Sequence, residues 1–218
     1  STPYDEERVD LLEELEVPAF KVASTDTNNH LLLDYMAKKG RPMIYSTAMS
    51  TLEEVKAGVK VIRSRGLKGL VVLQCTGSYP SPIEEANLRA MRTIAEECDV
   101  LVGYSDHVQG ETAAVAAVAL GACVYEKHFT LDKKMGGPDH LASLNPDELK
   151  EMVQGIRNIE IALGSDIKRP SPSELKNKNI ARKSIVANKI INQGEVFTEL
   201  NLGVKRPGTG ISPMQWTS

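Results

Sequence analysis

The chain contains 218 residues, of which 41% are hydrophobic and 25% are charged, so its composition is that of a folded globular protein and excludes a disordered one. Its formal net charge of -3 provides no broad attraction to nucleic acid or to an anionic membrane, and no apolar stretch is long enough to span a bilayer. Three widely spaced cysteines without a CxxC pair fit neither a zinc ribbon nor a disulfide framework. We therefore expect a cytoplasmic protein whose partners are small molecules, not nucleic acid or a membrane.

Short apolar runs that end in polar residues alternate with amphipathic helical patterns over the first three quarters of the chain. One helix, over residues 51–65, is predicted to begin with a capping box in which Ser50 is followed three residues later by Glu53. The predicted strands are residues 19–24, 42–47, 69–76, 100–106 and 123–128.

This order of elements predicts an α/β fold with a parallel sheet. Each predicted strand ends in Lys, Ser, Thr, Asp or His. Polar residues at that position of successive strands are typical of the active-site end of a (β/α)8 TIM barrel. An open doubly wound sheet is built from the same units, so the repeat alone does not decide between the two folds.

The composition changes after Gly164. Residues 165–176 contain two prolines among small and charged residues, which indicates a linker. Residues 177–218 contain short β runs, such as 182–187 and 190–191, and predict a small, mostly β domain after the barrel part at 1–164. Both ends of the chain fall where an element would continue, so we expect a fragment that contains only part of a barrel.

His107 follows the fourth predicted strand, and His128 ends the fifth. If those strands are neighbours, the two imidazoles lie about one strand spacing, roughly 5 Å, apart. Such a pair suits Mn²⁺, Fe²⁺, Co²⁺ or Zn²⁺ better than Mg²⁺. The alternative is two unrelated, hydrogen-bonded histidines, and spacing alone favours that alternative.

Candidate anion-binding groups also gather at the strand ends. A lysine supplies charge and hydroxyl groups supply directed donors, a combination that suits a phosphate or carboxylate. For any single Ser or Thr the alternative is a helix N-cap, so the case depends on the recurrence over several strands. The candidates are Lys21, Ser24, Ser46, Thr47 and Ser105.

Two loops carry weaker signals. Residues 136–140, Gly-Gly-Pro-Asp-His, place Asp139 where its carboxylate could meet a sugar hydroxyl or a metal-bound water, although such a sequence is more often a simple turn. Tyr79, followed by Pro80, is an aromatic candidate whose alternative role is loop packing.

Taken together, six ordered motifs closely resemble the sialic acid synthase family. The tail, at residues 182–187 and 205–213, resembles the antifreeze-like (SAF) domain of that family. The resemblance runs from residue 1 to residue 218 in the family's order. The six motifs are residues 20–24, 45–49, 75–80, 103–107, 126–130 and 137–140.

The resemblance implies a transferase that condenses phosphoenolpyruvate with N-acetylmannosamine, or a related acylamino sugar, to give a sialic (nonulosonic) acid and phosphate. It leaves open which acylamino sugar is used. Another phosphoenolpyruvate-dependent sugar-acid synthase is an alternative, as is a carbohydrate-binding fragment without catalytic activity.

The resemblance also implies roles for individual residues. His107 and His128 would hold Mn²⁺ or another divalent metal, and with Glu126 they form the implied catalytic set. A two-residue offset turns Glu126 to the same side of its strand as His128. The implied phosphoenolpyruvate contacts are Thr2, Lys21, Ser24, Ser46 and Ser105, and the implied sugar contacts are Tyr79, Glu126 and Asp139.

In the family the SAF domain of one subunit covers the barrel mouth of its partner. The resemblance therefore implies a domain-swapped homodimer in which Arg206 reaches the N-acyl group of the sugar. Gly77 departs from the family, which often has a polar residue there, and Lys183 replaces a common arginine. The first barrel strands, which in the family bring a catalytic glutamate, have no counterpart in this chain, so we expect the 218 residues alone to be inactive.

Overall fold

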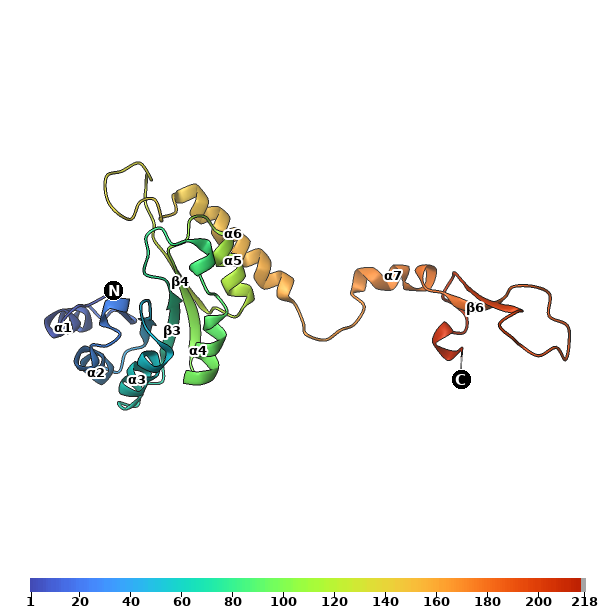
Figure 1. Ribbon diagram of the computed structural model, residues 1–218, viewed down its shortest axis with the longest axis horizontal. Coiled ribbons are helices and arrows are strands. Elements are labelled where there is room, and N and C mark those ends of the chain that lie inside the picture. Colours follow the sequence, from blue (N-terminus) through green and yellow to red (C-terminus); the bar gives the residue numbers. More distant parts are fainter. Residues whose placement is uncertain (217–218) are drawn as a thin grey trace. The chain divides into compact units, whose positions relative to one another are not determined.

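The computed structural model describes residues 1–216, and the chain folds into two compact units, Ser1–Gly164 and Ser165–Ser218 (Figure 1). Among the described residues, no helix is long and apolar enough to cross a membrane.

The first unit is a parallel sheet with helices between its strands. The strands are hydrogen-bonded in chain order, and every neighbouring pair is parallel, which is the arrangement of half of a (β/α)8 barrel. The strands are β1 (Phe20–Val22), β2 (Met43–Ser46), β3 (Leu70–Cys75), β4 (Leu101–Asp106) and β5 (Val124–Lys127). The helices are α1 (Glu6–Glu14), α2 (His30–Lys38), α3 (Leu52–Arg63), α4 (Ala90–Cys98), α5 (Thr112–Ala119) and α6 (Pro146–Leu163), with short 3-10 helices η1 (Ser24–Asp26) and η2 (Ile83–Glu85).

The hydrophobic core lies between one face of this sheet and the helices. Phe20 and Val72 from the strands and Leu33 and Ile62 from the helices are fully buried in it. Successive residues of a strand point to opposite faces, so the residue after Phe20, Lys21, points away from the core. The pleat thus separates an apolar face that packs on the helices from a second face that is free to carry polar residues.

Gly103 in β4 allows this strand to lie close to β3 and β5. A Cβ atom there would lie 2.2 Å from the carbonyl oxygen of Val124 and 2.6 Å from Cδ2 of Leu73. Distances under 3 Å are not tolerated by backbone atoms, so only glycine lets β4 lie this close to its neighbours.

The predicted parallel α/β sheet is confirmed. Each observed strand lies within its predicted range and is one or two residues shorter at each end, except that β4 ends at Asp106 as predicted. The predicted capping box was wrong by one residue. The N-cap of α3 is Thr51, whose side chain accepts from the backbone N–H of Glu54 while the Glu54 carboxylate accepts from the backbone N–H of Thr51. Ser50 instead donates to the carbonyl of Ala48 at 3.3 Å, because it precedes the residue at which the helix begins.

The second unit contains helix α7 (Pro172–Ala181), strands β6 (Ser184–Ala187) and β7 (Leu202–Lys205), and 3-10 helix η3 (Pro213–Gln215). The two strands form one antiparallel pair. Helix α7 begins within the predicted linker, because Ser171, Pro172 and Glu174 form a strong helix start with a capping box. The predicted β run at 190–191 is not a strand. The assignment of this unit to the SAF type stays a prediction, and residues 217 and 218 of the predicted domain lie outside the described residues.

The cap of α3 generates a stability prediction with a control at the neighbouring position. We expect Thr51→Ala to lower the free energy of unfolding of the first unit by about 1 kcal/mol, the usual contribution of an N-cap side chain. Urea unfolding followed by circular dichroism measures the change. Ser50→Ala is the matched control and should alter stability much less, so equal losses from the two variants would contradict the assignment of Thr51 as the cap.

Candidate active site

A cavity of about 470 Å³ opens at the carboxyl ends of β1 to β5. Its walls come from the polar face of the sheet and from the loops that follow the strands, as expected for the active-site end of a barrel. It brings together the predicted site residues except Thr47, Asp139 and Arg206. Those it contains are Thr2, Lys21, Ser24, Ser46, Tyr79, Ser105, His107, Glu126 and His128.

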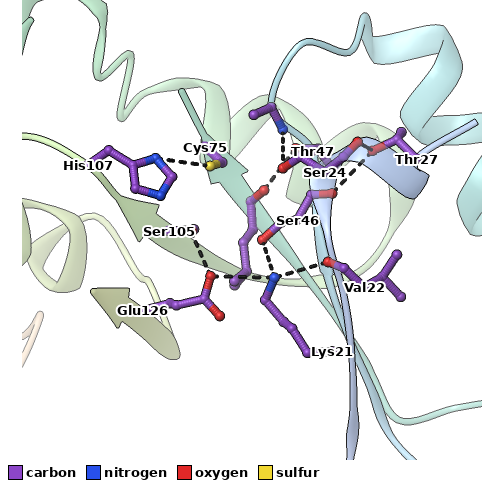
Figure 2. Close-up of polar contacts among 12 residues, drawn as sticks. Lys21, Val22, Ser24, Thr27, Ser46, Thr47, Cys75, Ser105, His107 and Glu126 are labelled. Atoms are coloured by element: carbon purple, nitrogen blue, oxygen red, sulfur yellow. Dashed lines mark hydrogen bonds and ion pairs between the residues drawn. The ribbon is translucent and has the colours of Figure 1, made fainter. Parts of the chain in front are cut away.

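One side of the cavity is built around Lys21, as Figure 2 shows. The Lys21 ammonium donates to Ser46 Oγ at 2.7 Å and to the carbonyl oxygen of Val22 at 3.0 Å. Its side chain is only 15% exposed, so the charge is held in place at the wall. A fixed cation beside a hydroxyl is a suitable binding group for a phosphate or carboxylate.

Two further hydroxyl groups on this side differ in what they can offer a ligand. Ser24 Oγ accepts from the backbone N–H of Ala48 at 2.9 Å and lines the cavity. Thr47, grouped with the candidate anion donors in the sequence, donates to the carbonyl of Leu73 at 2.8 Å and is buried. Thr47 therefore does not join the cavity wall, because its side chain ties β2 to β3.

Glu126 lies between this cationic side and the histidines. Its Oε1 accepts from Ser105 Oγ at 2.7 Å and lies 3.4 Å from Lys21 Nζ (Figure 2). The side chain is 42% exposed, so the carboxylate faces the cavity and keeps capacity to accept hydrogen bonds from a bound hydroxyl. The inward orientation predicted for Glu126 is confirmed.

The two histidines stand side by side on the other side of the cavity. Their ring centroids are 5.2 Å apart, and the ring of Tyr79 lies 4.0 Å from that of His107 and 5.5 Å from that of His128. His107 Nδ1 lies 2.7 Å from the carbonyl oxygen of Thr76. A carbonyl only accepts, so Nδ1 carries the proton and the neutral ring keeps its Nε2 lone pair for a ligand.

This environment holds His107 in the neutral form. Burial lowers the pKa of His107, the hydrogen bond to the Thr76 carbonyl opposes that shift, and the nearby His128 adds to it. A neutral imidazole with its other nitrogen fixed on a carbonyl is the usual state of a histidine that ligates a metal.

The two imidazoles are suited to supply two of the ligands of a metal site. Among residues 1–216, no group of three or more His, Cys, Asp or Glu side chains is placed to hold a metal ion. Asp139 Oδ2 lies 4.0 Å from His128 Nδ1, too far for a hydrogen bond but near enough to place the carboxylate beside the pair.

The remaining predicted residues lie at different places. Thr2 reaches the cavity because the backbone N–H of Lys21 donates to the carbonyl of Ser1 at 2.8 Å, which holds the first residues beside β1. Arg206 belongs to the second unit, and its proposed contact with substrate stays a prediction.

Sequence reasoning missed Cys75, which also lines the cavity. Its Sγ lies 3.8 Å from His107 Nδ1, and burial raises the pKa of the thiol, so Cys75 is a neutral neighbour of the site. The signal was the strand pleat, since Cys75 follows the inward-facing Leu73 by two residues. At the rim, Gly77 faces Met49, whose Cγ would lie 3.3 Å from a Cβ at position 77.

The lowered pKa of His107 generates a prediction for NMR titration. We expect its ring to titrate below the reference value of 6.5. Between the two pKa values the unfolded chain binds more protons, so the contribution of His107 to stability is present above pH 6.5 and is lost as the pH falls toward the folded pKa. A His107→Gln variant assigns the signal, and a midpoint at or above 6.5 in the folded protein would contradict the inferred burial of a neutral ring.

Comparisons with known proteins all indicate the same family. The model of the NeuB family matches residues 1–168. An N,N'-diacetyllegionaminic acid synthase of Campylobacter jejuni is 50% identical over 99% of this chain and 65% of its own length. The chain thus spans just under two thirds of that relative.

Solved structures agree with this result. The crystal structure of the spore coat polysaccharide biosynthesis protein SpsE of Bacillus subtilis has a TM-score of 0.72 and 40% identity, with 97% of this chain and 63% of that one covered. An N-acetylneuraminic acid synthetase of Leptospira borgpetersenii, solved with citrate, has a TM-score of 0.76 and 33% identity over 81% of this chain and 61% of that one. This chain, with its half-barrel and its strand-end cavity, belongs to the NeuB family of sialic acid synthase-like proteins.

Proposed function

We propose that this chain contributes to the active site of a synthase that condenses phosphoenolpyruvate with N-acetylmannosamine, or a related acylamino sugar, to form a nonulosonic acid and phosphate. The observation that carries the proposal is the division of one cavity into a cationic side at Lys21 and a histidine side at His107 and His128, with Glu126 between them. The names of the relatives, which include legionaminic, pseudaminic and sialic acid synthases, support the same class of reaction.

Phosphoenolpyruvate carries a phosphate and a carboxylate, and both need fixed donors. We assign them to the side of the cavity where the Lys21 ammonium is held by Ser46. A partly buried cation attracts an anion more strongly than an exposed one, because less water screens the charge. The residues assigned to this substrate are Thr2, Lys21, Ser24, Ser46 and Ser105.

The sugar fits the opposite side. Glu126 and Asp139 are carboxylates able to accept hydrogen bonds from its hydroxyl groups, and the Tyr79 ring offers an apolar surface to its carbon skeleton. We assign the N-acyl group to Arg206, contributed by the partner subunit of a domain-swapped homodimer. We also place the protein in the cytoplasm and its second unit in the SAF type.

His107 and His128 would hold a divalent metal such as Mn²⁺, which as a Lewis acid polarises the aldehyde of the open-chain sugar. The Thr76 carbonyl keeps the proton of His107 on Nδ1 and so leaves Nε2 available. The ring of Tyr79 packs against His107 and lies edge-on to His128.

In the proposed reaction, C3 of phosphoenolpyruvate attacks the aldehyde carbon and forms the new C–C bond. Water adds to the cation left at C2, and one of its protons goes to the former aldehyde oxygen. The C2–O bond to phosphate then breaks and leaves a ketone at C2, while the second water proton goes to the departing phosphate. Lys21 stays beside the departing phosphate, and Glu126 holds the sugar hydroxyls so that the aldehyde faces C3. The arrangement lowers the barrier chiefly by positioning two substrates in one cavity.

Phosphate release tests the proposed function. In the complete natural protein that contains these residues, we expect release from phosphoenolpyruvate to require both Mn²⁺ and an acylamino mannose. A panel of acylamino sugars identifies the substrate, and phosphorylated aldoses serve as the comparison. Failure of every acylamino sugar would overturn the proposal, and turnover of a phosphorylated aldose alone would favour another phosphoenolpyruvate-dependent sugar-acid synthase.

The metal pair is tested by His107→Ala and His128→Ala. Loss of either ligand should weaken Mn²⁺ binding by about 100-fold, which corresponds to about 3 kcal/mol. Isothermal titration calorimetry measures the affinity. His30→Ala is the matched control, because His30 is exposed at the start of α2 and outside the cavity. Unchanged affinity in both site variants would show that the metal is bound elsewhere.

The cationic side is tested by Lys21→Met, which keeps the length of the side chain and removes its charge. We expect KM for phosphoenolpyruvate to rise by about 10- to 100-fold, the contribution of a charge-assisted hydrogen bond. Steady-state kinetics with the sugar at saturation measure the effect. Lys56→Met is the control, since Lys56 pairs with Glu53 and Glu97 on the surface. A rise in KM for the sugar alone would reverse the assignment of the two sides.

A further inference from the structure

A buried ion pair joins the ends of the two strands that precede the histidines. Its charged groups bond to each other on the helix side of the sheet, although Lys127 also contributes to the lining of the cavity. Asp106 and Lys127 form the last register pair of the β4–β5 ladder, and their side chains are 0% and 3% exposed. Lys127 Nζ lies 2.9 Å from Asp106 Oδ2. Asp106 immediately precedes His107, and Lys127 immediately precedes His128.

This pair holds the chain on both sides of His107. Asp106 Oδ1 accepts from the backbone N–H of Val108 at 2.8 Å, and its Oδ2 also accepts from the hydroxyl of Tyr125. Lys127 in turn donates to the carbonyl oxygen of Val108. The residues before and after His107 are therefore both anchored to β5.

The two imidazoles lie just beyond the ladder. The carbonyl of His107 accepts from the backbone N–H of Ser81 and that of His128 from the backbone N–H of Leu144, both at 2.9 Å, so backbone bonds tie each histidine to a different segment. The paired register of β4 and β5 ends at Asp106 and Lys127, so no backbone pairing between these strands holds His107 against His128. The side-chain pair supplies a directed link at that point. One residue further along, on the cavity face, the ring centroids are 5.2 Å apart.

Packing alone does not explain the choice of residues. An apolar pair of similar volume fills a buried position as well as an ion pair, and often more stably, because two charges need not be removed from water. What an ion pair with additional hydrogen bonds adds is a defined geometry. A metal site needs such geometry, since its ligands must stay at fixed separation and orientation.

We propose that Asp106 and Lys127 are positioning residues that set the separation and orientation of His107 and His128, with Tyr125 as their third member. The proposal rests on the function proposed above, in which the two histidines hold a divalent metal. In this proposal, side chains on the helix side of β4 and β5 determine how tightly the histidines on the cavity side bind a metal.

The test compares Mn²⁺ affinity in four variants of the complete protein. Asp106→Asn removes one charge, and the double variant Asp106→Asn/Lys127→Met removes both, so that no unpaired charge remains buried. Tyr125→Phe removes a single donor at constant charge. Val59→Ala, in the core on α3, lowers stability away from the site and is the control.

We expect the dissociation constant for Mn²⁺ to rise by about 10- to 100-fold in Asp106→Asn and in the double variant, and less in Tyr125→Phe. The affinity for phosphoenolpyruvate should not change, because Lys21 is untouched. A merely structural pair would give the opposite pattern for the double variant, in which recovered stability would bring recovered Mn²⁺ affinity. Wild-type Mn²⁺ affinity in Asp106→Asn and the double variant would overturn the proposal.

A second measurement needs no metal. Long-range ¹H–¹⁵N spectra of the wild-type imidazoles should show His107 with its proton on Nδ1, and the double variant should lose this single tautomer. If the wild-type protein bound no Mn²⁺ through its histidines, the proposed function would fail. If it bound Mn²⁺ while tautomer and affinity survived in the double variant, only the positioning role would fail.

Discussion

The strict alternation of side chains along five parallel strands is the constraint on which the rest of the first unit depends. In β1, Phe20 and Val22 pack on the helices while Lys21, between them, reaches the cavity. The same pleat turns Ser105 and Glu126 inward from β4 and β5. Because the strands are parallel, these inward residues meet at one edge of the sheet, and a set of residues far apart in sequence becomes one site. A shift of one residue in any register would exchange core and cavity residues.

Alternation and composition also determine how much of the fold could be predicted. Each strand was found in its place because an apolar run ends in a polar residue, and that pattern follows directly from a buried strand that ends at a cavity. The start of α3 could not be chosen in the same way. Ser50 and Thr51 each precede a glutamate by three residues, so both satisfy the capping box, and only the backbone path decides for Thr51. Helix α7 was missed because Pro170 and Pro172, before and at its first residue, were interpreted as part of a linker.

The site residues that lie on strands could be predicted from the alternation of side chains. Those that lie in loops were harder to predict. The histidine spacing of roughly 5 Å followed from neighbouring strands alone. The role of the Thr76 carbonyl, which fixes the tautomer of His107, has no sequence signal because any residue has a carbonyl. Thr47 was grouped with the anion donors on residue type, yet it points to Leu73 and not to a ligand. Asp106 and Lys127 were missed for the reverse reason: they are charged residues on a face where the pattern predicts apolar ones.

Charged residues at buried positions, such as Asp106 and Lys127, indicate a specific role because burying a charge costs free energy. Removing one partner of a buried ion pair typically costs about 3–5 kcal/mol, a large fraction of the stability of a domain. With Asp106 and Lys127 at this position, the loss of either side chain would therefore destabilise the fold more than the loss of one residue of an apolar pair. At the carboxyl ends of β4 and β5, polar groups lie on both faces of the sheet. The histidines face the cavity, and the ion pair faces the helices. Because both meet at the last register pair, a substitution behind the histidines should change the stability of the sheet edge and the geometry of the site together.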